Sequence, residues 1–337
     1  MFSIEEIRAL STPHWELEKL FREKSPRTGS KPILSLADIQ MARLFIRMFY
    51  NIRNGTKPKP SSQPFLTQNI TIPVRDGTQL STRVYTPRKP SAQGCPCMFV
   101  CHGGGYVFGE LDGQDWLCEL FTSMGGVAVD VSYRLAPEHT FPTPIHDTYD
   151  SLVWVAQNFG QLHINPAKGF ILAGESNGSD IALAIAHLYR EQHPVLPALT
   201  GLYLACPMVM DKDTVPEKYR DYFLSMEQNA DGPILVTKSM DFIETVYKPD
   251  KSSPLALPIL FPDQSKLPKT YLQIAGMDPL RDGGLIFEEV LKESGVEVKT
   301  DLYAGLPHCF WGPFIHADFT KRHKTDTAAG LAWLLTN

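Results

Sequence analysis

Short runs that are either apolar or alternate between apolar and polar residues recur along the chain from residue 66 onward and predict the strands of a sheet. The runs are NITIPV, LSTRVY, CMFVCH, GVAVDVSY, GFILAG, GLYLAC, KTYLQIAG and EVKTDLYAG. Segments with the i, i+3, i+4 pattern of helices separate the later runs, which indicates a largely parallel sheet with crossover helices. The first two runs have no helical segment between them, so we expect an antiparallel pair there. The predicted fold class is α/β, a mostly parallel sheet of about eight strands flanked by helices.

Two regions interrupt this alternation, and we interpret both as additions to one α/β core. The first, residues 1–65, is predicted to be helical and ends in the proline-rich stretch KPKPSSQP. The second, residues 211–255, is rich in charged and aromatic residues and is too long for a plain connection between two strands. The core then consists of residues 66–210 and 256–337.

The N-terminal region contains an amphipathic helical pattern. Its apolar stripe consists of Met41, Leu44, Phe45, Met48, Phe49 and Ile52, and Arg43, Arg47 and Arg53 fall off it. We expect the stripe to pack against the rest of the protein, with the lining of a substrate pocket as a secondary role.

Composition and charge narrow the function classes. The 337 residues are 43% hydrophobic and 20% charged, which is enough to bury a large core. The net charge of -5 and the lack of a basic run with interleaved aromatic residues argue against nucleic acid as a partner. No apolar stretch approaches the ~20 residues that span a bilayer, and the start MFSIEEIRAL is acidic where a secretory signal is basic. We expect a cytoplasmic protein without stable membrane insertion, and a homodimer stays open.

The six cysteines do not predict a metal site. They stand at positions 95, 97, 101, 118, 206 and 309, without a C-x-x-C pair and without zinc spacing. Most lie inside apolar runs, so we expect free thiols that pack as small buried hydrophobic residues. We expect no metal and no cofactor.

The stretch GESNG, residues 174–178, carries the strongest chemical signal. The apolar run FILAG leads into it, and a helical apolar pattern from Ile181 to Leu188 follows it. This is the G-x-S-x-G pattern in the strand, turn and helix context that presents a nucleophilic serine. The sequence therefore predicts Ser176 as a nucleophile on a strained turn, with Gly174 and Gly178 leaving room for the bend.

Two residues further along the chain are candidates for a catalytic triad. A serine hydroxyl needs a base to remove its proton, and the base needs a third group to hold its tautomer. In this architecture the acid and then the histidine follow the serine. Asp278 follows the predicted strand KTYLQIAG, and His308 follows the predicted strand KTDLYAG. We predict that both act together with Ser176.

Other acids and histidines are weaker candidates. We expect Asp282 to face away into the following helix or its cap. His316 and His323 lie beyond the expected loop and are expected at the surface. Glu175 and Asp147 are expected to be structural.

The glycine-rich stretch CHGGGYVFG, residues 101–109, follows the run predicted as the third strand. The loop after that strand is where this architecture places backbone N–H groups that face a developing oxyanion. Glycines let the backbone approach the substrate oxygen, whereas a plain tight turn does not explain the pairing with a nucleophile turn further along the chain. We expect His102 to hold the loop by hydrogen bonds and Tyr106 either to line the pocket or simply to pack.

The motifs HGGGY, YRLAPEHTFPTPIHD, GESNG, DPLRD and LPHCF, in this order, resemble those of the hormone-sensitive-lipase-like family of α/β-hydrolases. The resemblance covers the chain from residue 66 to its end. It implies a triad of Ser176, Asp278 and His308. It implies an oxyanion hole formed by Gly104, Gly105 and the N–H of Asn177, and a helical cap built from the N-terminal segment and residues 211–255.

Residue 177 departs from the family pattern, which usually has alanine after the nucleophile. The oxyanion donor at this position is a backbone N–H, so we expect it to survive the change to Asn177. The amide side chain either alters the polarity or size of the hole or turns away and does nothing.

Three function classes remain. The leading one is a serine hydrolase that cleaves carboxylic esters of small or medium-sized molecules through an acyl-enzyme. The second uses the same triad for lactone or thioester cleavage, acyl transfer, or a non-hydrolytic elimination or cyclisation. The third is a binding protein on an inactive hydrolase scaffold, and an intact triad argues against it.

Overall fold

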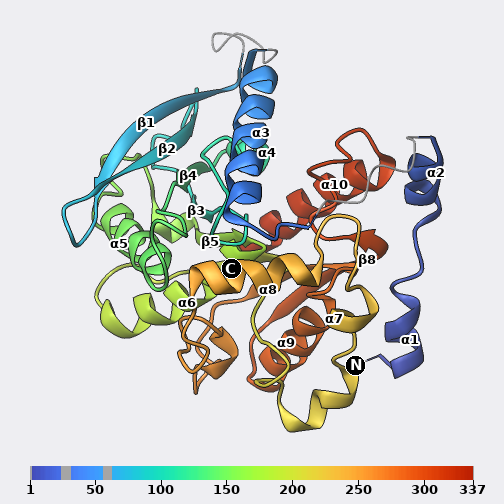
Figure 1. Cartoon of the computed structure of the whole chain (residues 1–337). Helices are drawn as coiled ribbons and strands as arrows, with labels where there is room; N and C mark the ends of the chain where they lie inside the picture. The colour runs from blue at the N-terminus through green and yellow to red at the C-terminus, as the bar shows by residue number, and fades with distance from the viewer. Residues whose placement is uncertain (1, 24–31, 56–62, 337) are drawn as a thin grey trace.

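The computed structural model describes residues 2–23, 32–55 and 63–336, and its centre is an eight-stranded sheet (Figure 1). The strands are β1 (Phe65–Pro73), β2 (Gln79–Pro87), β3 (Cys97–Cys101), β4 (Val127–Val131), β5 (Phe170–Glu175), β6 (Gly201–Ala205), β7 (Thr270–Met277) and β8 (Val298–Pro307). Their order across the sheet is β1-β2-β4-β3-β5-β6-β7-β8. β2 is antiparallel to β1 and to β4, and the other neighbours are parallel. The predicted fold class and the antiparallel entry are confirmed.

The central strands are apolar because both faces of the sheet are covered. Every residue of β3, β4, β5 and β6 is buried. A parallel strand with helices on both sides has no solvent face, so it is a continuous apolar run rather than an alternating one. This is why these strands could be found from the sequence.

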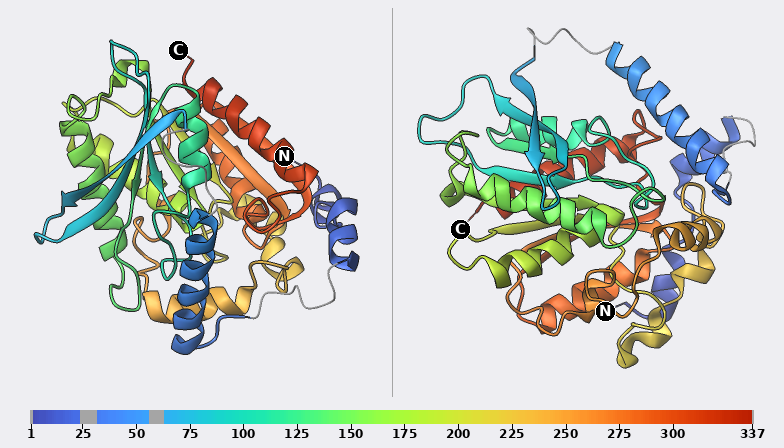
Figure 2. Two further views of the ribbon diagram at one scale, coloured as in Figure 1. Left: turned by 90° about the horizontal axis from the view of Figure 1, so that it is seen from above. Right: turned by 60° about the vertical axis from the view of Figure 1, so that its left-hand side comes forward.

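Helices form a layer on each face of the sheet (Figure 2). The helices of one layer are α4 (Asp115–Ser123) and α10 (Asp318–Leu334), and those of the other are α5 (Thr143–Gln157), α6 (Asn177–Gln192) and α9 (Arg281–Glu293). Side chains of β3 alternate between the two layers: Phe99 packs in one core cluster with Leu152 and Ile181, and Met98 packs in the other with Leu117 and Leu331.

The remaining helices lie outside these two layers. Those near the N-terminus are α1 (Ile4–Ala9), α2 (Trp15–Glu23) and α3 (Leu36–Gly55). Residues 211–255 add no strand to the sheet and contain a 3-10 helix (Glu217–Tyr222), α7 (Ser225–Gln228) and α8 (Thr237–Tyr247). Most of the proline-rich stretch 57–64 lies outside the described residues.

The orientation of α3 is opposite to the one we predicted. The stripe residues whose side chains are described are all more than half exposed: Met41, Leu44, Phe45, Met48 and Ile52. An arginine from beside the stripe holds the helix to the core instead. The Arg43 side chain donates hydrogen bonds to the carbonyl oxygens of Val107 and Ala136, at 2.8 and 2.6 Å, and pairs with Glu138. The expected packing of the stripe was wrong, because a helical period identifies an apolar face but not its partner.

Within the described ranges, the helices are all too short or too polar to cross a bilayer.

Candidate active site

The turn between β5 and α6 raises Ser176 above the end of the sheet. Ser176 has φ 55° and ψ -128°, a conformation that non-glycine residues rarely adopt, and its N–H donates to the carbonyl of Ala205 at 2.8 Å. A Cβ atom on Gly178 would lie 2.2 Å from the carbonyl oxygen of Cys101. Glycine is therefore required where the helix passes the neighbouring strand, as the G-x-S-x-G pattern predicts.

Ser176, His308 and Asp278 form a row of hydrogen bonds. The distance from His308 Nε2 to Ser176 Oγ is 2.9 Å, and that from His308 Nδ1 to Asp278 Oδ2 is 2.6 Å. Asp278 and His308 each directly follow the last residue of a strand, β7 and β8, and both are buried. The structure thus brings together three side chains that are separated by 132 and 30 positions in the sequence.

The buried charge of Asp278 sets the protonation of the imidazole. Burial lowers the pKa of His308, but the charge of Asp278 and its hydrogen bond raise the pKa further, so that it stands well above the ordinary value. The N–H of Leu280 donates to Asp278 Oδ1 at 2.9 Å, which holds the carboxylate in place. The result is a ring whose Nδ1 faces an anion and whose Nε2 faces the serine hydroxyl.

The alternative acids and histidines lie elsewhere. Asp282 is not a partner of His308, but it does not face into its own helix α9 as we expected: its Oδ2 accepts from the N–H groups of Leu224 and Ser225, at 2.7 and 2.6 Å, at the start of α7. His316 is exposed, as predicted. The prediction for His323 was wrong: its ring is fully buried, and burial lowers its pKa to about 3. His323 Nε2 lies 2.9 Å from Gln273 Oε1, a partner on β7 that no local pattern could reveal.

The glycine loop after β3 passes beside the nucleophile turn. Gly104 has φ 126°, and a Cβ atom there would lie 2.4 Å from the carbonyl oxygen of Phe108, so a side chain would not fit. His102 Nδ1 lies 2.9 Å from the carbonyl oxygen of Gly103, and the ring stacks on Tyr133 with 4.0 Å between centroids. Burial lowers the pKa of His102 to about 4, so the ring is neutral and packs within the loop.

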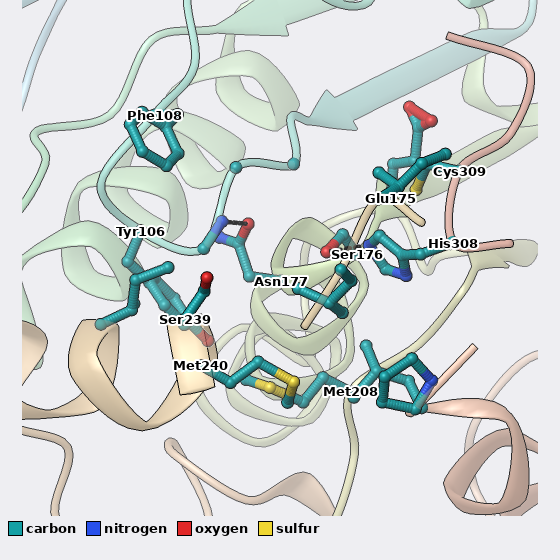
Figure 3. A pocket seen from close by; sticks show the side chains of 18 of the residues that line it. Tyr106, Phe108, Glu175, Ser176, Asn177, Met208, Ser239, Met240, His308 and Cys309 are labelled. Carbon is teal, nitrogen blue, oxygen red and sulfur yellow. Dashed lines mark hydrogen bonds between the residues drawn. The ribbon is translucent and has the colours of Figure 1, made fainter. Parts of the chain in front are cut away.

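The side chain of Asn177 does not turn away. Its Oδ1 accepts a hydrogen bond from the N–H of Gly105 at 2.7 Å (Figure 3). Its Nδ2 donates to the hydroxyl of Tyr133 at 3.1 Å. One of the three N–H groups implied as oxyanion donors is therefore occupied by a neighbouring side chain. The sequence identified residue 177 as unusual, but this contact depends on two loops that are 72 positions apart.

Tyr106 lines the pocket and also packs. Its ring lies 3.8 Å from the ring of Tyr247 of α8, centroid to centroid, in a stacked arrangement, and its hydroxyl donates to Asp180. Only 3% of the residue is exposed. Both alternatives that the sequence left open are thus realised together.

A pocket of about 1110 Å³ opens above Ser176 (Figure 3). One part of its lining, the sheet side, consists of Gly103, Gly104, Gly105, Ser176, Asn177 and His308. The opposite part, the helical side, consists of Ala42 and Ile46 of α3 with Met226, Met240, Ile243 and Tyr247 of residues 211–255. Apolar side chains therefore make up part of the helical side, which also carries charged residues such as Asp241, Glu244 and Lys251.

Sequence reasoning missed a cluster beside the histidine. The six cysteines are free thiols, and all except Cys309 are buried, as predicted. However, ligand atoms of Cys206, His308 and Cys309 all lie within 4.8 Å of one another. Cys206 directly follows β6, and Cys309 follows the end of β8 by two residues. Both positions lie at the carboxyl edge of the sheet, and this shared placement could have indicated from the sequence that the two thiols meet.

Comparison with known proteins places this geometry among hydrolases. A family model described as the alpha/beta hydrolase fold matches residues 98–312. An AB hydrolase superfamily protein of Schizosaccharomyces pombe is 36% identical over 271 residues, which cover 80% of each chain. A versiconal hemiacetal acetate esterase of Dothistroma septosporum is 33% identical over 282 residues, 82% of this chain and 84% of that one. The crystal structure of a vibralactone cyclase is similar with a TM-score of 0.87 and 30% identity, covering 97% of this chain and 96% of that one.

Proposed function

The chain belongs to the alpha/beta hydrolase family and is a carboxylic ester hydrolase, and we propose that it cleaves its ester through an acyl-enzyme formed on Ser176. The observation that carries the proposal is the row of hydrogen bonds from Ser176 through His308 to Asp278. In a neutral ring whose Nδ1–H donates to Asp278, Nε2 keeps the lone pair that can accept the serine proton.

In the acylation step, His308 Nε2 takes the proton of Ser176 while Oγ attacks the ester carbonyl. The proton then passes from Nε2 to the leaving alcohol, and the acyl group stays on Ser176. Asp278 stabilises the positive charge that His308 carries between these two transfers. In the second step, His308 activates a water molecule, which releases the acid and restores the serine.

The oxyanion of the tetrahedral intermediate binds to the backbone N–H groups of Gly104, Gly105 and Asn177 in this proposal. The Gly105 N–H reaches the oxyanion only when the side chain of Asn177 releases it, because Asn177 Oδ1 accepts from it at 2.7 Å. As negative charge develops on the substrate oxygen, the Gly105 N–H therefore exchanges its hydrogen bond to Asn177 Oδ1 for one to the oxyanion.

The pocket supports a proposal for the substrate class. A volume of about 1110 Å³ lies at the upper end of the roughly 300–1,000 Å³ that is usual for small-molecule sites. Methionines 208, 226 and 240 and Ile243 give it flexible apolar walls. We propose that the acyl or alcohol part is hydrophobic and of medium size, and that α3 and residues 211–255 act as a cap over it. A cytoplasmic location and a homodimer remain predictions.

Cyclisation is the second candidate function. It is favoured by the similarity to a vibralactone cyclase and by the occupied N–H of Gly105. Here a hydroxyl of the acyl group, instead of water, attacks the acyl-enzyme carbonyl, the hydroxyl proton goes to His308, and Ser176 leaves as a lactone forms. Products made in oxygen-18 water separate the two candidates, because only hydrolysis places the label in the released acid.

The test of the nucleophile is labelling with a fluorophosphonate probe. We expect the probe to modify Ser176 and Ser176→Ala to abolish labelling and ester turnover without unfolding the protein. Ser239→Ala is the matched control, since Ser239 lines the same pocket but its hydroxyl accepts from the N–H of Ile33 at 2.8 Å. Labelling of any serine other than Ser176 would contradict the proposal.

The test of the substrate class is a series of p-nitrophenyl esters of increasing acyl length. We expect kcat/KM to rise from acetate to medium-length acyl groups, because each added methylene buries apolar surface against the helical side. A steady fall from acetate onward would refute the hydrophobic substrate but leave the acyl-enzyme proposal standing.

A further inference from the structure

Two cysteines and the triad histidine converge at the edge of the sheet. Cys206 is 2% exposed, His308 is 7% exposed, and Cys309 is partly buried and lines the pocket. Their Sγ and ring nitrogen atoms lie within 4.8 Å of one another, and the described part of the chain contains no second group of this kind. Figure 3 shows His308 and Cys309 beside Ser176 at the same end of the pocket.

The backbone at both cysteines is unusual. Cys206 has φ 48° and Cys309 has φ 45°, in the left-handed region that non-glycine residues rarely occupy. Cysteines that only fill space inside a strand or a helix need no such conformation. Such conformations cost free energy and concentrate at functional sites, so the two thiols are held beside His308 by the surrounding structure.

This set of ligand atoms suits a zinc-type divalent ion. Two thiolates and one imidazole are common zinc ligands, with bond lengths of about 2.3 Å to sulfur and about 2.0 Å to nitrogen. Two thiolate charges balance the two positive charges of the ion, which lowers the cost of burying it. Asp278 accepts from His308 Nδ1 at 2.6 Å, the carboxylate–histidine arrangement that orients imidazole ligands of zinc.

We propose that Cys206, Cys309 and His308 form a binding site for Zn²⁺ and that the bound ion switches the enzyme off. Binding releases the two thiol protons to solvent, and the lone pair of His308 Nε2 goes to the metal. Three protein ligands leave a fourth position for water or for the hydroxyl of Ser176. The ion enters from the pocket, which Cys309 and His308 both line.

The inhibition rests on the proposed function, whereas the binding does not. A histidine that is bound to zinc cannot accept the proton of Ser176, so the acylation step stops. A chelator that removes the ion restores the base. The metal therefore competes reversibly with the proton of Ser176 for the lone pair of His308 Nε2.

The first experiment measures binding directly on the reduced, full-length protein. We expect one Co²⁺ per chain with a thiolate-to-metal charge-transfer absorption, and displacement of Co²⁺ by Zn²⁺ in competition with a chromophoric chelator. Cys206→Ala and Cys309→Ala should each remove the absorption. The matched control is Cys118→Ala, because Cys118 is also fully buried but belongs to α4, and it should bind as the unaltered protein does.

Two further variants change the hydrogen-bond partners of His308. Asp278→Asn should weaken Zn²⁺ binding by about tenfold or more, as expected for the loss of the group that orients a histidine ligand. Ser176→Ala should retain tight binding although it cannot turn over substrate. An unchanged affinity for Zn²⁺ in both cysteine variants, or a Co²⁺ complex without a thiolate absorption, would refute the proposed site.

Activity and thiol protection complete the test. Zn²⁺ should inhibit ester cleavage and a chelator should restore it. If a cysteine variant fails to fold, alkylation of the unaltered protein takes its place: Zn²⁺ should protect Cys309, which lines the pocket, from iodoacetamide. Alkylation of Cys309 at the same rate with and without Zn²⁺ would refute the site. Zinc binding in a protein without esterase activity would refute the proposed function alone.

Discussion

The sheet side and the helical side of the pocket are built in different ways. On the sheet side, Ser176, Asn177 and His308 follow strand ends, and their side chains are held by hydrogen bonds to one another or to Asp278 and the glycine loop. On the helical side, Ala42 and Ile46 present small or flexible apolar groups. In the proposed function, the sheet side fixes the reacting atoms, and the apolar part of the helical side accommodates a hydrophobic substrate.

The two sides also differ in how they attach to the core. α6, on the sheet side, buries Ile181, Ala184 and Ile185 completely. α3, on the helical side, leaves Leu44 62% exposed and binds the core through Arg43. Similar apolar stripes therefore have opposite environments in these two helices, and we expect substitutions on the sheet side to have far larger effects.

The largest effect is expected from Asp278→Asn. We expect kcat for ester cleavage to fall by about 10⁴-fold, because an amide neither holds the correct tautomer of His308 nor stabilises its positive charge. Steady-state kinetics on a p-nitrophenyl ester measure the loss. Asp282→Asn is the control: it weakens contacts to Leu224 and Ser225 and should lower thermal stability more than kcat. A larger loss of kcat in the control would reverse our assignment of the acid.

The second prediction concerns pH. His308 must be neutral to act as a base, so kcat/KM should rise with pH by about tenfold per unit below the pKa of His308. That pKa lies above the ordinary 6.5, so the rise should end above pH 6.5. The same shift stabilises the folded protein below pH 6.5, and this contribution disappears as the pH rises through the folded-state pKa. A profile that is flat from acid to alkaline pH would exclude His308 as the base.

The third prediction concerns Asn177. Asn177→Ala should raise kcat on short-chain esters by about two- to tenfold, because it frees the N–H of Gly105 and one exchanged hydrogen bond is worth roughly 0.5–1.5 kcal/mol. Asn177→Asp is the contrasting variant, since it keeps the size but adds a negative charge beside the oxyanion and should lower kcat. Under the cyclisation hypothesis, Asn177→Ala loses the native reaction while simple hydrolysis grows. If Asn177→Ala instead lowers kcat on short-chain esters, the Asn177 side chain assists hydrolysis.

The smallest effect is expected on the outer surface of the helical side. Leu44→Asp should change the free energy of unfolding by less than about 0.5 kcal/mol, because the side chain is 62% exposed. Ile39→Asp, on the buried face of the same helix, should cost several times more. Urea unfolding measures both. If Leu44→Asp strongly lowers the free energy of unfolding, the apolar stripe of α3 is covered in solution. A sedimentation coefficient that changes with protein concentration would then show that a second copy of the chain covers it.

Local patterns were sufficient for the sheet and for the candidate catalytic residues. The eight strands are short apolar or alternating runs bounded by turn residues, and this signal needs no knowledge of a partner. Ser176 was found from the G-x-S-x-G pattern, and Asp278 and His308 were found because each directly follows a strand end, and the carboxyl ends of parallel strands meet at one edge of a sheet. Their hydrogen bonds agree with that placement, and their catalytic roles remain proposals.

Contacts between distant segments were decided only by the tertiary structure. The exposed stripe of α3, the buried ring of His323, the hydrogen bond from Gly105 to Asn177 and the meeting of Cys206 with Cys309 each depend on how two segments far apart in the sequence pack. Sequence periodicity specifies which side of an element is apolar, but the partner of that side is chosen by the packing of the whole chain. For the same reason, the proposed chemistry of this protein depends on residues at strand ends, whereas its proposed selectivity depends on the residues of α3 and α8 that line the pocket.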